Sequence, residues 1–153
     1  MGDKQYAKYL NRQTVKVICE PLTEYRICGS EDAKEFLSEY MKEFDREHAV
    51  ALLLDVSKRI QSIYEISIGT LTGSLVHPRE VFKAAILANA DSIILAHNHL
   101  SAEIVPSDQD ICITSRIQEA GKILGIPMLD HLIVGRLGCY SFAEETGLLK
   151  DLE

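Results

Sequence analysis

His97 and His99 stand two residues apart at the polar end of an apolar run, residues 92–99, that is typical of a buried strand. Because side chains alternate across a strand, both imidazoles project from one face and Asn98 projects from the other. Asp110 follows one turn into a predicted helix, at the head of its apolar stripe. Two imidazoles and one carboxylate leave a fourth position for water, as in catalytic zinc sites. The pattern predicts a zinc ion that activates a water for hydrolysis.

Simpler explanations of these residues stay open. The two histidines can be a chance pair or a hydrogen-bonded pair, and Ser107 with Asp110 forms a capping-box pattern that needs no metal. Taken alone, either the histidine pair or Asp110 favours the simpler explanation. Together, on a strand and a helix joined by a loop, they favour a metal site. His131 is an alternative fourth ligand, although a hydrogen-bonded core histidine is favoured there.

The elements that must position these residues alternate between strands and helices. Helices are expected from Ser30, which we predict as an N-cap, over residues 79–90 after Pro78, and over residues 108–124. Strands are expected at residues 14–20, 25–28, 47–55, 60–68, 92–99, 127–134 and 139–142. This alternation predicts an α/β fold with a mixed β-sheet flanked by helices.

Length and charge narrow the class of protein. The 153 residues predict one domain, and the net charge of −7 disfavours direct nucleic-acid binding. No apolar run reaches the roughly 18 residues of a membrane span, and no signal peptide is visible. The cysteines lack C-x-x-C spacing and read as reduced, mostly buried thiols of a cytoplasmic protein: Cys19, Cys28, Cys112 and Cys139.

The histidine–aspartate spacing, with Ser101 two residues beyond His99, resembles the JAMM motif of JAB/MPN-domain metalloproteases. The segments VHPREVFKAAILANADSIILAHNH, PSDQD, LDHLIVG and YSFAEETGLL resemble the RadC-like branch of that family, over roughly residues 47–149. The family stretch usually reads His-Asn-His-Pro-Ser-Gly, and here Leu100 and Ala102 replace the proline and the glycine.

The resemblance implies a single JAB/MPN domain of the cytidine-deaminase-like fold, which we place at residues 25–153, after a lead-in at residues 1–24. It also implies a peptide or protein substrate cut at a peptide or isopeptide bond. Glu47 would be the general base, in preference to Glu43 or Glu65, and Ser101 would stabilise the oxyanion. No helix-hairpin-helix DNA-binding module is expected before Tyr25, and an oligomer is possible.

Two other functions stay open. One is an interaction module that keeps the fold without turnover, weakly favoured by Leu100 and Ala102. The other is a role associated with DNA repair, because RadC-like proteins carry that label. The intact set of His97, His99 and Asp110 favours the hydrolase.

Overall fold

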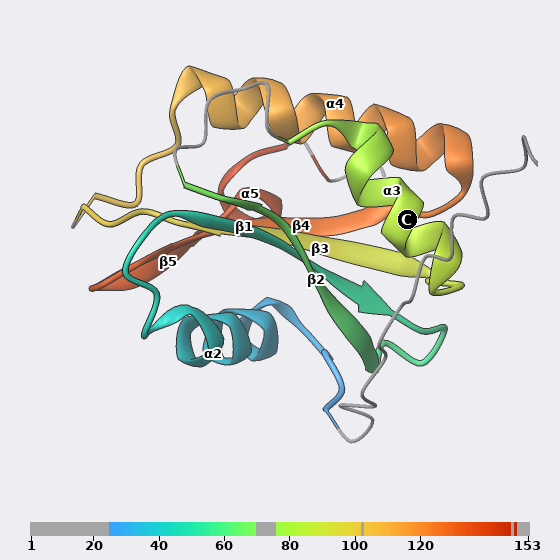
Figure 1. Ribbon diagram of the computed structural model, residues 1–153, viewed down its shortest axis with the longest axis horizontal. Helices are drawn as coiled ribbons and strands as arrows, with labels where there is room; N and C mark the ends of the chain where they lie inside the picture. The colour runs from blue at the N-terminus through green and yellow to red at the C-terminus, as the bar shows by residue number, and fades with distance from the viewer. Residues whose placement is uncertain (1–24, 70–75, 102, 148, 150–153) are drawn as a thin grey trace, which may run out of the picture.

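A five-stranded mixed sheet forms the centre of the molecule (Figure 1). The computed structural model describes residues 25–69, 76–101, 103–147 and 149, so the strand predicted at 14–20 and Cys19 lie outside the described residues. The strand order is β2-β1-β3-β4-β5. The strands are β1 (His48–Leu54), β2 (Ile60–Ile68), β3 (Ser92–Asn98), β4 (Met128–Gly135) and β5 (Gly138–Ser141).

Helices cover both faces of this sheet. Helix α2 (Ser30–Met41) lies on one face, and α3 (Pro78–Leu87) and α4 (Asp108–Leu124) lie on the other, as Figure 1 shows. The short helix α5 (Phe142–Glu145) follows β5. The predicted fold class, an α/β fold with a mixed sheet flanked by helices, is confirmed.

The pairing of the strands fixes where the functional residues lie. Strand β1 pairs antiparallel with β3, with Ala49 opposite His97. Strands β3 and β4 pair in parallel, with His97 opposite Ile133. The carboxyl ends of β3 and β4 and the amino end of β1 therefore lie side by side at one end of the strands. Open α/β sheets bind ligands at the carboxyl ends of their strands.

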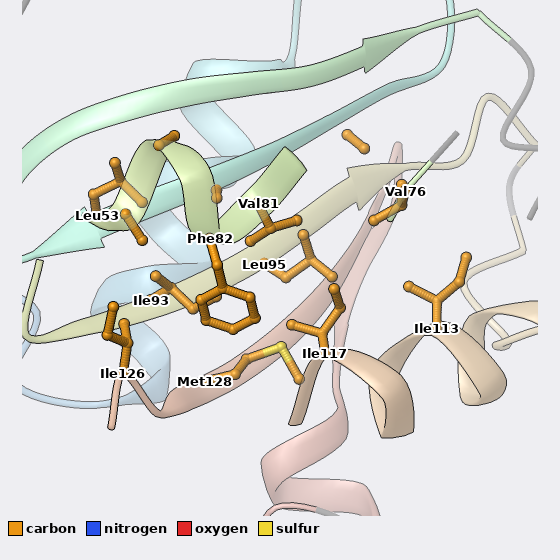
Figure 2. Packing of buried hydrophobic residues seen from close by; sticks show 14 of the residues in the cluster. Leu53, Val76, Val81, Phe82, Ile93, Leu95, Ile113, Ile117, Ile126 and Met128 are labelled. Atoms are coloured by element: carbon orange, nitrogen blue, oxygen red, sulfur yellow. The ribbon is translucent and has the colours of Figure 1, made fainter. Parts of the chain in front are cut away.

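Two apolar clusters fill the space between the sheet and its helices. On the α3/α4 face, Phe82 and Ile117 pack against Leu95 and Met128 (Figure 2). On the α2 face, Leu37 and Met41 pack with a second set, Val50, Leu52, Ile94 and Leu132. Strands β1 and β3 contribute to both clusters and are buried along their whole length, as their nearly continuous apolar runs predict.

Several local predictions need correction. Gly29 rather than Ser30 is the N-cap of α2, which has no side-chain cap bond, because the Ser30 hydroxyl instead faces Asp130 at 3.5 Å. The strand predicted at 25–28 is reduced to an isolated bridge between Arg26 and Arg59. Strand β5 ends at Ser141, whose side chain caps α5, so Phe142 is helical.

The cysteines and the helices bear on two further expectations. Cys28 and Cys112 are exposed and Cys139 is half-buried, so the prediction of mostly buried thiols is wrong for the described cysteines, all three of which are free. Among the described residues, no helix combines the length and apolar character required to cross a membrane.

Candidate metal centre

The structure brings His97, His99 and Asp110 together at the edge where β3 ends. His97 Nε2 lies 3.0 Å from His99 Nε2 and 3.2 Å from Asp110 Oδ1, and His99 Nε2 lies 3.7 Å from Asp110 Oδ2. Donors about 2.0–2.2 Å from a tetrahedral zinc ion stand roughly 3.3–3.6 Å apart, and the three observed separations lie within about 0.3 Å of that range. Within the described residues, this is the one group of three or more metal-ligating side chains found.

The space beside these atoms suits an ion. A cavity of about 10 Å³ is lined by His97, Asp110 and His131 together with apolar side chains. Such a volume holds about one water-sized particle. His97 and Asp110 are buried, at 3% and 5% exposure, whereas His99 is half-buried. The donor set therefore fits a single metal ion, with His99 on its more exposed side.

His99 is held by the loop that follows it. Its Nδ1 lies 3.2 Å from the carbonyl oxygen of Glu103. A carbonyl can only accept, so Nδ1 carries the proton and Nε2 keeps its lone pair toward the cluster. A backbone carbonyl is a common outer partner of metal-binding histidines, and it orients the ring before a metal arrives.

Asp110 serves as both cap and candidate ligand. Its Oδ2 accepts bonds from the Ser107 amide and hydroxyl, both at 2.7 Å, and the Ser107 hydroxyl accepts from the Asp110 amide at 3.2 Å. The capping box is thus real, and the Oδ1 atom still faces His97. Burial acts to raise the pKa of Asp110, but the bonds and charge from His97 and the bonds from Ser107 outweigh it, so the pKa lies well below its ordinary value. Asp110 is therefore a carboxylate at neutral pH.

His131 is buried in the core beside His97. Its ring stacks on Phe142, with centroids 5.0 Å apart, and both ring nitrogens have partners, Thr114 and His97. Burial, followed by the charge of His97, lowers the pKa of His131 well below its ordinary value, so the ring is neutral. The favoured prediction of a hydrogen-bonded core histidine is confirmed.

Glu47 directly precedes β1 and is half-buried. Ala49 lies opposite His97 and packs into the α3/α4 cluster. Continuing that alternation and register by two residues places Glu47 on the same face, level with His99. Its carbonyl accepts from the Gly69 amide at 2.8 Å, which holds the backbone at this point.

The competing glutamates lie elsewhere. Glu65 pairs through Oε2 with His48 Nδ1 at 2.9 Å, and that imidazole stacks on Phe44 of the α2 face. Its carboxylate therefore faces away from His97, on the opposite side of the sheet. Glu43 is exposed just after α2. Of the three candidates, the backbone places only Glu47 on the face of the metal cluster.

Ser101 lies next to the cluster but is engaged with its own loop. It is exposed, and its hydroxyl donates to the Glu103 carbonyl at 3.3 Å, the same oxygen that accepts from His99. Rotation about one side-chain bond would free the hydroxyl for a substrate. The oxyanion role of Ser101 stays a prediction.

Asn98 is a residue whose role the sequence did not reveal. Its side chain lies on the α2 face as alternation predicts, where Oδ1 accepts from the His48 amide at 2.6 Å and Nδ2 donates to the Arg46 carbonyl at 3.0 Å. These two groups belong to the peptide bonds on either side of Glu47. One amide therefore clamps the backbone of the candidate base from the middle of the histidine pair. The only signal for it was an amide between two candidate ligands.

His48 and His77, for which no partner was predicted, are also explained. His48 binds Glu65 as described above, and His77 caps α3 by accepting the Arg79 amide on Nδ1 at 3.2 Å. Both histidines have structural partners outside the cluster of His97, His99 and Asp110.

Comparisons with known proteins find relatives of this chain. The chain is 42% identical to a UPF0758 protein of Clostridium kluyveri over 126 residues, 82% of this chain and 55% of that protein. It is 50% identical to a UPF0758 protein of Desulforudis audaxviator over 105 residues, 69% of this chain and 46% of that protein. The chain thus spans about half the length of the curated relatives it matches.

A family model covers most of the chain. The model of the RadC-like JAB domain matches residues 27–148, which contain every residue of the metal cluster, Glu47 and Ser101. The five-stranded sheet with helices on both faces agrees with the JAB/MPN-type α/β fold. The chain therefore belongs to the RadC-like JAB domain family.

Proposed function

We propose that this chain is a zinc-dependent hydrolase of peptide or isopeptide bonds. The observation that carries the proposal is the convergence of His97 Nε2, His99 Nε2 and the Asp110 carboxylate at the carboxyl end of β3. Two nitrogens and one oxygen form the ligand set of catalytic zinc sites. Family membership supports the same reading, although the relatives carry only the name UPF0758.

The residues divide the chemistry among them. A zinc ion bound there would polarise the substrate carbonyl and lower the pKa of a coordinated water to about 7. The Glu47 carboxylate would take the proton of the attacking water and pass it to the leaving amine. The Ser101 hydroxyl would donate a hydrogen bond to the oxygen that becomes negative. Asp110, kept ionised by its hydrogen bonds, would hold the metal throughout.

A cavity on the α2 side of the sheet touches the cluster at His99 and offers a place for part of a substrate. It measures about 510 Å³, reaches His99 and Leu100, and carries the cationic side chains Lys42 and Arg136 together with apolar walls from Met41 and Val134. Its size is within the usual range for ligand pockets. It supports a substrate chain that runs past His99 toward α2.

The first test is metal content. The purified protein is expected to carry about one zinc per chain by mass spectrometry of the metal, and Asp110→Asn is expected to lose it. Asparagine can still accept the Ser107 amide, so the helix cap survives. Asp108→Asn, an exposed change in the same helical turn, is the matched control and should keep the metal. Full zinc occupancy after replacement of His97, His99 and Asp110 together would exclude the site.

The second test separates the base from the ligands. Glu47→Gln is expected to keep its zinc and to lower turnover of an internally quenched peptide or an isopeptide-linked conjugate by about 10²–10⁴-fold, the usual contribution of a positioned base. Glu43→Gln is the control and should leave turnover unchanged. Equal turnover by wild type and Glu47→Gln would remove Glu47 from the mechanism. A zinc-loaded wild type that cuts neither class of bond would favour the non-catalytic interaction module.

A further inference from the structure

We propose that Thr114 and His131 are positioning residues for the metal, joined in one hydrogen-bonded chain that fixes which nitrogen of His97 is free to bind it. The proposal rests on the metal site proposed above and adds two residues that do not touch the ion. It follows from three hydrogen bonds that join four residues, taken in order from Asp110 to His97.

The hydrogen-bonded chain begins at the backbone carbonyl of Asp110, which can accept a hydrogen bond but cannot donate one. The Asp110 carbonyl oxygen lies 2.6 Å from Thr114 Oγ1, so the threonine proton must point toward it. Thr114 stands one turn after Asp110 in α4, the spacing at which a hydroxyl reaches back to the i−4 carbonyl. With its single proton used, Thr114 Oγ1 can only accept from its other neighbour.

That neighbour is His131, whose Nδ1 lies 2.6 Å from Thr114 Oγ1. Nδ1 must therefore carry the proton, and the neutral ring keeps a lone pair on Nε2. This Nε2 lies 2.9 Å from His97 Nδ1, so His97 donates in turn. Each bond dictates the direction of the next.

The chain ends at the metal cluster. Because Nδ1 of His97 donates to His131, Nε2 is the nitrogen left to bind the metal, and it lies 3.0 Å from His99 Nε2 and 3.2 Å from Asp110 Oδ1. The chain thus links two of the three candidate ligands without passing through the ion. It runs from α4 through β4 to β3 and is buried at each side chain.

Packing holds the intermediate ring in the required orientation. His131 is 1% exposed and stacks nearly parallel on Phe142, at an angle of 8°. Outer partners of this kind orient metal-binding histidines and typically contribute 10–100-fold to metal affinity. With both nitrogens engaged, His131 has no atom left to be a ligand itself.

The experiment measures zinc affinity by competition with a chromophoric chelator. His131→Leu removes the acceptor for His97 and is expected to weaken zinc binding by about 10–100-fold. His131→Gln places an amide oxygen where Nε2 was and is expected to retain most of the affinity. Thr114→Val should weaken binding, whereas Thr114→Ser, which keeps the hydroxyl, should not. Equal affinity of His131→Leu and wild type, in folded protein, would overturn the proposal.

A second readout does not depend on the metal. Long-range ¹H–¹⁵N spectra of histidine-labelled protein should show His131 protonated on Nδ1 and unprotonated on Nε2. The opposite tautomer would reverse the chain and refute the proposal even if zinc binds. If wild type binds no zinc, the proposed function fails while this spectrum still decides the direction of the chain. If His131→Leu does not fold, the Thr114 pair and the spectrum carry the test.

Discussion

Asn98 shows how one side chain between two candidate ligands can organise a different part of the site. Its amide accepts from the His48 amide and donates to the Arg46 carbonyl, on the face away from the metal cluster. Asn98 is 5% exposed, and its bond to the His48 amide is buried. The backbone position of Glu47, just before β1, therefore depends on a hydrogen bond to a residue about fifty positions further along the sequence.

We expect Asn98→Leu to destabilise the protein while leaving its zinc in place. Leucine has a similar volume but leaves the buried His48 amide unpaired, which costs about 1–3 kcal/mol, and also removes the partner of the Arg46 carbonyl. Urea denaturation would measure the loss of free energy of unfolding, and metal analysis would measure zinc content. An unchanged midpoint would contradict the clamp, and lost zinc in a folded variant would contradict its separation from the ligands.

The described thiols should differ sharply in reactivity. Burial raises the pKa of Cys139 to about 12, and the thiolate is the reactive form. Cys139 is therefore almost entirely a neutral thiol at pH 8, whereas Cys28 and Cys112 are exposed. Peptide mapping after brief iodoacetamide treatment is expected to show Cys28 and Cys112 labelled before Cys139. Denatured protein, in which all are accessible, is the control, and early labelling of Cys139 would show that its surroundings open.

At the scale of elements, the sequence predicted the long helices and buried strands well. Helix α4 spans Asp108–Leu124 as predicted, because its capping box and Gly125, in the left-handed region at φ 69°, mark both ends. Strand β2 covers Ile60–Ile68 as predicted. The predictions were wrong where a distant residue competes for a side chain. The Ser30 hydroxyl, for example, donates to Asp130 and does not cap an amide of α2.

The candidate site was predictable only in part. Strand alternation placed His97 and His99 on one face, and helix periodicity aimed Asp110 at the sheet. The clamp of Asn98 and the chain through Thr114 depend on which strands are neighbours, and no local pattern encodes that. The parallel pairing of β3 with β4 is what brings His131 beside His97.

Helices α3 and α4 approach closely at Gly121. A Cβ there would lie 2.6 Å from the backbone oxygen of Ile126 and 3.3 Å from the Phe82 ring. Gly121→Ala is expected to lower the free energy of unfolding by about 1–3 kcal/mol by overpacking, despite the better helix propensity of alanine. Gly147→Ala, where the new carbon meets nothing within 4 Å and no helix is capped, should change stability little. Thermal denaturation of both variants compares them directly, and a stabilised Gly121→Ala would mean that the loop at Ile126 yields.

The whole molecule carries a net charge of −7, which disfavours binding to the negatively charged backbone of a nucleic acid. We expect binding to duplex DNA no tighter than about 10⁻⁵ M at physiological salt, in the non-specific range. Fluorescence anisotropy with a labelled duplex at two salt concentrations would measure it. A nanomolar complex would contradict the prediction and favour a direct role in DNA repair. The curated relatives are about twice as long, so the measurement concerns this chain alone.

The antiparallel pairing of β1 with β3 also has a consequence for the order in which the protein folds. The ladder joins Leu54 to Ser92 across a long connection, and closing a long loop costs chain entropy before its contacts repay it. Helices α3 and α4 need only local bonds, so they can form earlier. The metal cluster needs β3, the loop after it and α4 in place together. Zinc capture during refolding should therefore lag behind the recovery of helical signal. Zinc binding would then report the final step of assembly.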